Sequence, residues 1–137
     1  MIQGKIKCTN VFHKAYGSKT RITCLQGGTR SSKSYSLTQL FLVKCLEDTG
    51  KTYTICRKTL PALKGTAYRD FLEILKELDL YTEENHNKSE LSYLLNGNLI
   101  EFISIDQPTK IRGRKRNCLW LNEANEFTYE DWQQLIL

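Results

Sequence analysis

One short stretch of the sequence, residues 27–34, constrains the fold more than any other. It reads Gly-Gly-Thr-Arg-Ser-Ser-Lys-Ser and lies between a β-leaning run at 22–25 and a long apolar run at 35–46. A strand, a glycine-rich turn that ends in Lys-Ser, and a helix are the layout of a nucleotide-phosphate cradle. The stretch therefore predicts a phosphate loop, with a surface turn that carries a lysine as the alternative.

Each residue type in this stretch suits a phosphate group. Two successive glycines let the backbone bend so that its N–H groups point at an anion. Lys33 supplies positive charge for the outer phosphates, and the Ser34 hydroxyl is a hard oxygen suited to Mg²⁺. Ser32 stands where the usual pattern G-x-x-x-x-G-K-[ST] has its second glycine. The predicted nucleotide-binding residues are Gly27, Gly28, Thr29, Arg30, Ser31, Ser32, Lys33 and Ser34.

Composition narrows the class of protein. A chain of 137 residues fits one domain, and its 40% hydrophobic content argues against disorder. Twenty Lys+Arg against 15 Asp+Glu give a net charge of +5, which permits a polyanionic partner without requiring one. Five cysteines without C-x-x-C spacing favour free thiols in a reducing compartment. No apolar run reaches ~18 residues, so we expect no membrane-spanning segment.

Strand and helix patterns alternate after the phosphate loop. The apolar residues of 35–46 lie all round the predicted helix, so we expect it to be covered on several sides. A β-branched run at 52–56 predicts a second strand, parallel to the strand at 22–25 in a βαβ unit. Apolar residues on one face of 66–78 predict an amphipathic helix. The expected fold is therefore α/β, with a mostly parallel sheet flanked by helices.

The second half adds a hairpin and a late strand. Asn-Gly at 96–97 separates two alternating runs within 90–103, which predicts an inserted antiparallel hairpin. Four apolar residues at 118–121 lead into Asn122 and Glu123, as in a fully buried parallel strand with a polar end. Residues 128–131 form a capping box at the start of the last helix.

Three further groups each have two interpretations. Phe12 and Tyr16 either stack on an adenine base or pad the edge of the domain. Arg57, just past the second strand, either faces the nucleotide or a neighbouring subunit, or is a solvated strand end. A basic run either contacts DNA phosphates or a neighbouring nucleotide, or is a solvated loop. Its cations are Lys110, Arg112, Arg114, Lys115 and Arg116.

Four stretches together resemble the ATPase half of the large terminase subunit of tailed phages, the motor that packs DNA into proheads. They are residues 27–34, 56–60, 105–113 and 119–127. No single stretch is specific, but their order and spacing are. The resemblance implies a P-loop NTPase fold of the ASCE type, with residues 1–137 as the N-terminal part of the ATPase domain.

The resemblance also implies a role for each site residue. Lys33 would hold the β- and γ-phosphates of ATP, and Ser34 would bind Mg²⁺. Arg30 would sense or neutralise the γ-phosphate, and Glu123 would orient the attacking water. Asn122 occupies the metal-side position where the family usually has an aspartate, and its uncharged amide predicts weaker Mg²⁺ affinity. The catalytic candidates are thus Lys33, Arg30 and Glu123, and the metal candidates are Ser34 and Asn122.

The family's large subunit normally continues into a nuclease, which these residues do not include, so we expect a fragment with an incomplete sheet. The implied function is ATP-driven translocation of double-stranded DNA into the prohead, in the host cytoplasm and away from any membrane. A homo-oligomeric ring, a portal protein and the small terminase subunit are the implied partners. The alternatives are a non-catalytic or degenerate nucleotide- or DNA-binding module, and a helicase-like or kinase-like P-loop enzyme.

Overall fold

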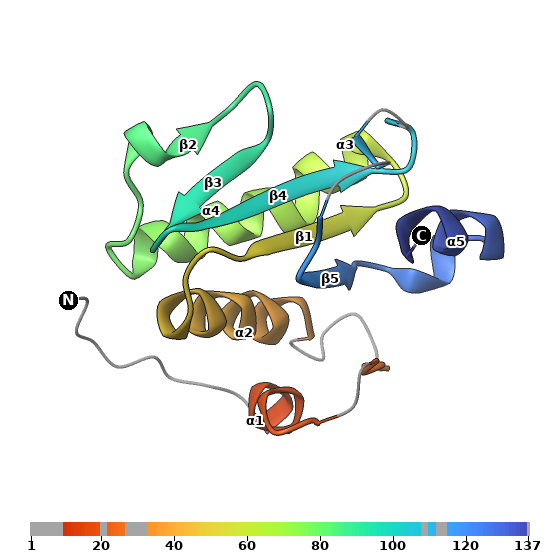
Figure 1. Cartoon of the computed structure of the whole chain (residues 1–137), viewed down its shortest axis with the longest axis horizontal. Helices are drawn as coiled ribbons and strands as arrows, with labels where there is room; N and C mark the ends of the chain where they lie inside the picture. The colour runs from red at the N-terminus through yellow and green to blue at the C-terminus, as the bar shows by residue number, and fades with distance from the viewer. Residues whose placement is uncertain (1–9, 20–21, 27–32, 108–109, 112–114, 137) are drawn as a thin grey trace.

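A mixed β-sheet forms the centre of the molecule (Figure 1). The computed structural model describes residues 10–19, 22–26, 33–107, 110–111 and 115–136. Its five strands are β1 (Thr52–Arg57), β2 (His86–Asn87), β3 (Ser92–Leu95), β4 (Asn98–Ser104) and β5 (Cys118–Leu121). They lie in the order β2-β3-β4-β1-β5. β1 pairs in parallel with both β4 and β5, whereas β2, β3 and β4 are antiparallel. The predicted α/β class and the hairpin within it are confirmed, but the described sheet is mixed and not mostly parallel as predicted.

Helices flank this sheet. The α-helices are α1 (Asn10–Tyr16), α2 (Lys33–Glu47), α3 (Leu60–Leu63), α4 (Arg69–Glu77) and α5 (Tyr129–Ile136), and the 3-10 turns are η2 (Glu83–Asn85) and η4 (Ala124–Glu126). A π-helical turn, η1 (Lys64–Tyr68), joins α3 to α4. The helix expected at 66–78 thus begins at Leu60, where Pro61 fits the first turn because no N–H is needed there. No helix in the described part of the chain is long and apolar enough to cross a membrane.

One face of the sheet packs against α2 and α4. Alternate side chains of β1 and β4 point to this face, because successive residues of a strand point to opposite sides. Tyr53 and Phe102 contact aromatic rings of the two helices, at ring-centroid distances of 5.6 Å to Phe41 and 5.4 Å to Phe71. The remainder of this buried cluster includes Leu42, Cys45, Ile55, Ala67, Ile74, Leu75, Ile100 and Trp120. The large apolar face of α4 therefore forms core, as its spacing predicts.

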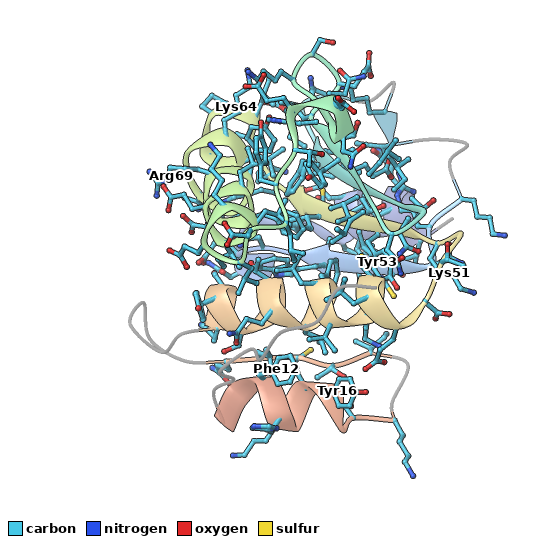
Figure 2. All side chains as sticks on the ribbon, turned by 90° about the vertical axis from the view of Figure 1, so that its left-hand side faces the viewer. Phe12, Tyr16, Lys51, Tyr53, Lys64 and Arg69 are labelled. Atoms are coloured by element: carbon cyan, nitrogen blue, oxygen red, sulfur yellow. The ribbon has the colours of Figure 1, made fainter. Side chains whose placement is uncertain are left out.

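The far side of α2 is covered by α1. Phe12 and Leu40 are buried together in a separate apolar cluster, so α2 is covered on two sides as its composition predicts. Figure 2 shows Phe12 and Tyr16 on α1, below α2. The Tyr16 hydroxyl donates a hydrogen bond to the Glu47 carboxylate at 2.6 Å, and its ring stacks on Phe12. These contacts support the interpretation of Phe12 and Tyr16 as packing residues.

The opposite face of the sheet carries a smaller core. Cys56, Ile103 and Ile111 are buried there with Leu135 of α5. A charged pair lies beside them, since Glu101 and Arg116 approach to 3.8 Å with both side chains almost fully buried. The Thr54 hydroxyl donates to the Glu101 carboxylate at 2.7 Å. Arg116 also donates to the carbonyl oxygens of Ile111 and Lys110 at 2.6 and 3.4 Å. Arg116 of the basic run is therefore an internal connector of loop and sheet.

The strand expected at 22–25 does not form. Residues 22–26 have no strand conformation, and Ile22 is 60% exposed. Strand propensity alone predicts a strand poorly, because a run of β-favouring residues also needs an adjacent strand that supplies hydrogen bonds and buried contacts. Both edges of β1 are already taken by β4 and β5. The prediction of a βαβ unit between 22–25 and β1 is therefore wrong for this structure.

The late strand also differs from its prediction. β5 ends at Leu121, so Asn122 and Glu123 lie just beyond it. β5 is the last strand of the described sheet, and Trp120 is its one buried residue. The expectation of a fully buried strand is wrong because β5 has a neighbour on one side within the described sheet. Its parallel direction, in contrast, is confirmed.

The hairpin turn fastens the end of α2 to the sheet. Asn96 and Gly97 both have positive φ, 52° and 76°, as a two-residue hairpin turn requires. The Asn98 amide donates to the carbonyl oxygens of Cys45 and Asp48, both at 2.9 Å. A Cβ at Gly97 would lie 2.3 Å from Thr49 Oγ1. The C-terminal end of α2 is thus held at the start of β4.

Replacing Arg116 by alanine should strongly destabilise the protein. The change leaves Glu101 buried without its charged partner, and breaking such a pair costs about 3–5 kcal/mol. Lys115→Ala, at the exposed neighbouring position, should change the free energy of unfolding by less than about 0.5 kcal/mol. Urea unfolding of the two variants measures both values. Equal stability of the two would show that the pair contributes nothing.

Candidate functional site

The carboxyl ends of three parallel strands bring polar residues to one edge of the sheet. Arg57 ends β1 and is followed by Lys58, Ser104 ends β4, and Asn122 and Glu123 follow β5. Ligands of open α/β sheets bind at this edge because loops from several strands converge there. It is therefore the candidate functional site.

The N-terminal end of α2 faces the same edge. α2 runs antiparallel to β1 (Figure 1), and its C-terminal end is held near the start of β4. Because α2 runs in the opposite direction to β1, its N-terminal end, which carries Lys33 and Ser34, points toward the edge at which β1 ends. The positive end of the α2 dipole thus faces the candidate site.

The structure locates some of the predicted nucleotide-binding residues. Gly27, Gly28, Thr29, Arg30, Ser31 and Ser32 lie outside the described residues. Lys33 opens α2 and is half-buried, and Ser34 is exposed. The Ser34 carbonyl accepts a hydrogen bond from the Thr38 hydroxyl at 2.8 Å, which fastens the first turn of the helix. The N-terminal end of α2, with Lys33 and Ser34, and the C-terminal end of β5, which Asn122 and Glu123 follow, thus point toward the same edge of the sheet.

Glu123 has an unusual backbone conformation. Its φ and ψ are 56° and 58°, in the left-handed region that a residue with a Cβ seldom occupies. Such a conformation costs on the order of 1–3 kcal/mol and persists where neighbouring contacts hold it. The preceding residue, Asn122, is 5% exposed, and its N–H donates to the Cys56 carbonyl at 2.8 Å. The chain thus turns sharply at Glu123, whose side chain is exposed at the edge.

Two ion pairs connect the end of β1 to the segment after β5. Arg57 Nε lies 3.2 Å from Glu126 Oε1, and Lys58 Nζ lies 2.5 Å from Asp131 Oδ2. Asp131 also accepts the Thr128 N–H at 2.9 Å, and the Thr128 hydroxyl accepts the Asp131 N–H at 3.1 Å. The predicted capping box is confirmed. Glu126 and Asp131 as partners of Arg57 and Lys58 were not predicted, since no local pattern joins residues about 70 positions apart.

Asp106 supports the same edge from β4. Its carboxylate accepts the Leu60 N–H at 3.1 Å, at the beginning of α3, and it also accepts the Ser104 hydroxyl. A carboxylate at a helix N-terminus satisfies an otherwise unpaired N–H and is favoured by the helix dipole. Asp106 thus fixes the start of the helix that follows β1. It belongs to the 105–113 stretch that carries the sequence resemblance.

The basic run divides between the interior and the surface. Arg116 points inward to Glu101, and Lys110 lies 4.0 Å from the exposed Glu90. Lys115 is exposed, and Arg112 and Arg114 lie outside the described residues. The prediction that Arg116 contacts DNA or a neighbouring nucleotide is therefore wrong, because its guanidinium is committed within the fold.

The sequence was also compared with models of known protein families. A family model described as phage terminase large subunit matches residues 19–137. The chain belongs to the phage terminase large subunit family. The resemblance drawn from the sequence is thereby confirmed. A search among curated proteins finds no match for the chain.

The region that matches the terminase family includes the residues of the candidate edge. The matched region contains the 27–34 stretch, the β1 end with Arg57, and the segment from Asn122 to α5. Terminase large subunits are generally ATPases, and the match supports a role in phage DNA packaging. The five-stranded sheet and its flanking helices are compatible with a P-loop-like fold.

The pairing of Asp131 should make stability depend on pH. Burial acts to raise the pKa of Asp131, but hydrogen bonds from Lys58 and Thr128 outweigh it and hold the pKa below its ordinary value. A lowered pKa in the folded state stabilises the fold above the unfolded pKa of about 3.9. This contribution disappears as the pH falls through the still lower folded pKa.

The variant Asp131→Asn tests this dependence. It should unfold about 1 kcal/mol more easily than the wild type at neutral pH, because a partly buried ion pair and a helix-end charge are lost. The difference should shrink as the pH falls below about 4. Glu130→Gln, at the exposed preceding position, is the control. A difference that stays constant across this range would contradict the assignment. Urea unfolding at several pH values measures it.

Proposed function

We propose that this chain binds and hydrolyses ATP with Mg²⁺, and that hydrolysis drives translocation of double-stranded DNA into the prohead. One observation carries the proposal. In a chain of the terminase family, the Lys33-Ser34 end of α2 and the Glu123 end of β5 face the edge of the sheet at which its parallel strands end. A triphosphate on the first and a water-orienting carboxylate at the second is the arrangement that P-loop hydrolysis requires.

The residue types at this edge support the proposal of a nucleotide bound with Mg²⁺. Ser34 is exposed at the N-terminal end of α2, and its hydroxyl is a hard oxygen suited to Mg²⁺. Asn122 would accept a hydrogen bond from a metal-bound water through its amide oxygen. When bound, Mg²⁺ would neutralise part of the phosphate charge. Lys33 would hold the β- and γ-phosphates, and the N–H groups at the start of α2 would add hydrogen bonds to the anion.

Glu123 and Arg30 have the remaining proposed roles. Glu123 would accept a hydrogen bond from the attacking water and orient it, a task suited to an exposed carboxylate at a strand end. Arg30, in the 27–34 stretch, would stabilise charge on the γ-phosphoryl group. Both roles rest on the resemblance to terminases and on the order of these residues along the chain. Residues 1–137 would then be the N-terminal part of the ATPase domain.

The proposed partners follow from membership in the family. Double-stranded DNA is the translocated substrate, and a net charge of +5 favours contact with its phosphates. A homo-oligomeric ring, the portal protein and the small terminase subunit would complete the motor in the host cytoplasm. Among the described cations of the basic run, the exposed Lys115 is the best placed for a surface contact.

A second candidate function is a nucleotide- or DNA-binding module without turnover. Two observations favour it: Asn122 stands where the family usually has an acid, and residues 22–26 do not join the sheet. A weaker metal site and a missing strand both reduce the support for catalysis. Such a module would bind an ATP analogue but release no phosphate, with or without DNA. The two functions are separated by measuring binding and hydrolysis on the same preparation.

Lys33→Ala and Glu123→Gln should fail at different steps. Loss of the lysine charge should weaken binding of an ATP analogue by about 10- to 100-fold, because a charge-assisted contact is removed. Glu123→Gln keeps the shape and should preserve binding, while hydrolysis falls by about 100-fold or more. Lys44→Ala and Glu130→Gln are matched controls on α2 and α5. Undiminished phosphate release by Glu123→Gln would remove Glu123 from its proposed role.

A further inference from the structure

The strained turn at Glu123 requires contacts that hold it in place. Two backbone hydrogen bonds lie within the turn: the Glu126 N–H donates to the Glu123 carbonyl at 2.9 Å, and the Phe127 N–H donates to the Ala124 carbonyl at 3.1 Å. Both are local and lie at the surface, since Glu123, Ala124 and Glu126 are exposed. Local bonds open to water hold a left-handed residue weakly. The Asn122 N–H bond to the Cys56 carbonyl anchors the chain before Glu123, so the side after Glu123 needs an anchor of its own.

Arg57 supplies that anchor from the central strand. Its Nε donates to Glu126 Oε1 at 3.2 Å, and its side chain is 15% exposed against 39% for Glu126. Arg57 is the last residue of β1, which is paired on both sides. The ion pair therefore ties the exposed turn to a strand that is paired on both sides. Because Glu126 also donates its N–H to Glu123, the anchor acts one hydrogen bond away from that residue.

The orientation of Arg57 is fixed in turn by Thr66. Arg57 Nη1 donates to the Thr66 hydroxyl oxygen at 2.6 Å, and that hydroxyl donates its own proton to the Ala62 carbonyl at 2.6 Å. With its proton committed to Ala62, the Thr66 oxygen presents lone pairs to the guanidinium. Thr66 lies in the π-helical turn η1, and π turns inside helices are frequent at functional sites.

Lys58 closes the other end of the same segment. It pairs with Asp131, which caps α5, so the chain from Glu123 to the first turn of α5 is held at two points by consecutive residues of one strand end. Of the two ion pairs, the one formed by Arg57 lies nearer to Glu123, because its partner Glu126 is only three residues further along the chain. Two of its guanidinium nitrogens are engaged by Glu126 and Thr66, which favours a holding role over direct contact with phosphate.

We propose that Arg57, oriented by Thr66, is a positioning residue that holds Glu123 in place through Glu126. The proposal rests on the proposed function of Glu123 as the residue that orients the attacking water. Arg57 then acts on the rate of hydrolysis without contacting nucleotide. This role separates it from Lys33 and Arg30, whose proposed contacts are with the phosphates themselves.

Steady-state kinetics on the full chain test the role. Arg57→Ala and Glu126→Ala should each lower kcat by about 10- to 100-fold, as loss of a supporting contact does. The KM for ATP and the affinity for an ATP analogue should change by less than about threefold, because no phosphate contact is lost. The double variant should be no slower than the slower single variant, since both remove one interaction.

Two matched controls accompany these variants. Arg69→Ala removes an exposed arginine whose ion pair is with the adjacent Asp70, and Figure 2 shows it on the outer side of α4. Glu130→Ala removes an exposed carboxylate on α5. Both should hydrolyse ATP at the wild-type rate. Thr66→Val, which keeps the side-chain shape, should lower kcat in the same direction by a smaller factor, and it replaces Arg57→Ala if that variant does not fold.

Amide hydrogen exchange gives a readout independent of hydrolysis. In Arg57→Ala the Glu126 and Phe127 amides should exchange faster than in the wild type, while Arg69→Ala leaves them unchanged. If the wild type hydrolyses no ATP, the proposed function fails, and the holding role of Arg57 is decided by this exchange alone. Unchanged exchange overturns the proposal. Weaker ATP binding in Arg57→Ala, with Glu126→Ala at wild-type activity, also overturns it and makes Arg57 a phosphate contact.

Discussion

The parallel pairing of β1 with strands on both sides is the constraint on which the rest of the structure depends. Parallel neighbours end at the same edge, so β4, β1 and β5 deliver their C-terminal residues to one place. A parallel strand also needs cover on both faces. α2 and α4 cover one face of β1, and Ile105, Ile111 and Leu135 of α5 pack against the other. The candidate site is therefore a consequence of strand direction.

On the face of the sheet opposite α2 and α4, neighbouring residues of the basic run have different environments. Arg116 enters the core beside Glu101, and its carbonyl acceptors tie the loop to the sheet, whereas Lys115 next to it remains exposed. A buried charge pair is costly to desolvate, and it persists here with additional hydrogen bonds from Thr54 and to the loop carbonyls. The pair ties Lys110 and Ile111 to the sheet, and the loss of either charged partner would leave the other one buried and unpaired. A run of like charges in a sequence is thus no guide to a single role.

The site edge combines a strained residue with a firm support. Glu123, the proposed water-orienting carboxylate, occupies a left-handed conformation just after β5. Arg57 and Lys58 form ion pairs with Glu126 and Asp131 in the segment that follows β5. Strain of this kind is retained where it orients a functional group and where the surroundings compensate for it. The proposed ATPase and the proposed positioning role both depend on this turn.

Local patterns in the sequence predicted several elements correctly. Asn96-Gly97 needs no distant residue to form its turn, and the capping box at Thr128 and Asp131 closes within four residues. The apolar composition of α2 predicted that it would be covered on several sides, since a helix without a polar face must be buried. The resemblance to terminases, carried by the order of four stretches, is confirmed by the family match.

Other features depended on distant partners. The run at 22–25 has the composition of a strand but no place in the described sheet, and β5 has the composition of a buried strand but lies at its end. The pairing of Arg57 with Glu126 and Thr66, and the burial of Arg116, join residues that no short pattern connects. The sequence by itself determined the local turns, caps and helix faces, because these depend on neighbours within a few residues. Only the tertiary structure decided which strands pair and which charges meet, because those energies arise when distant segments exclude water together.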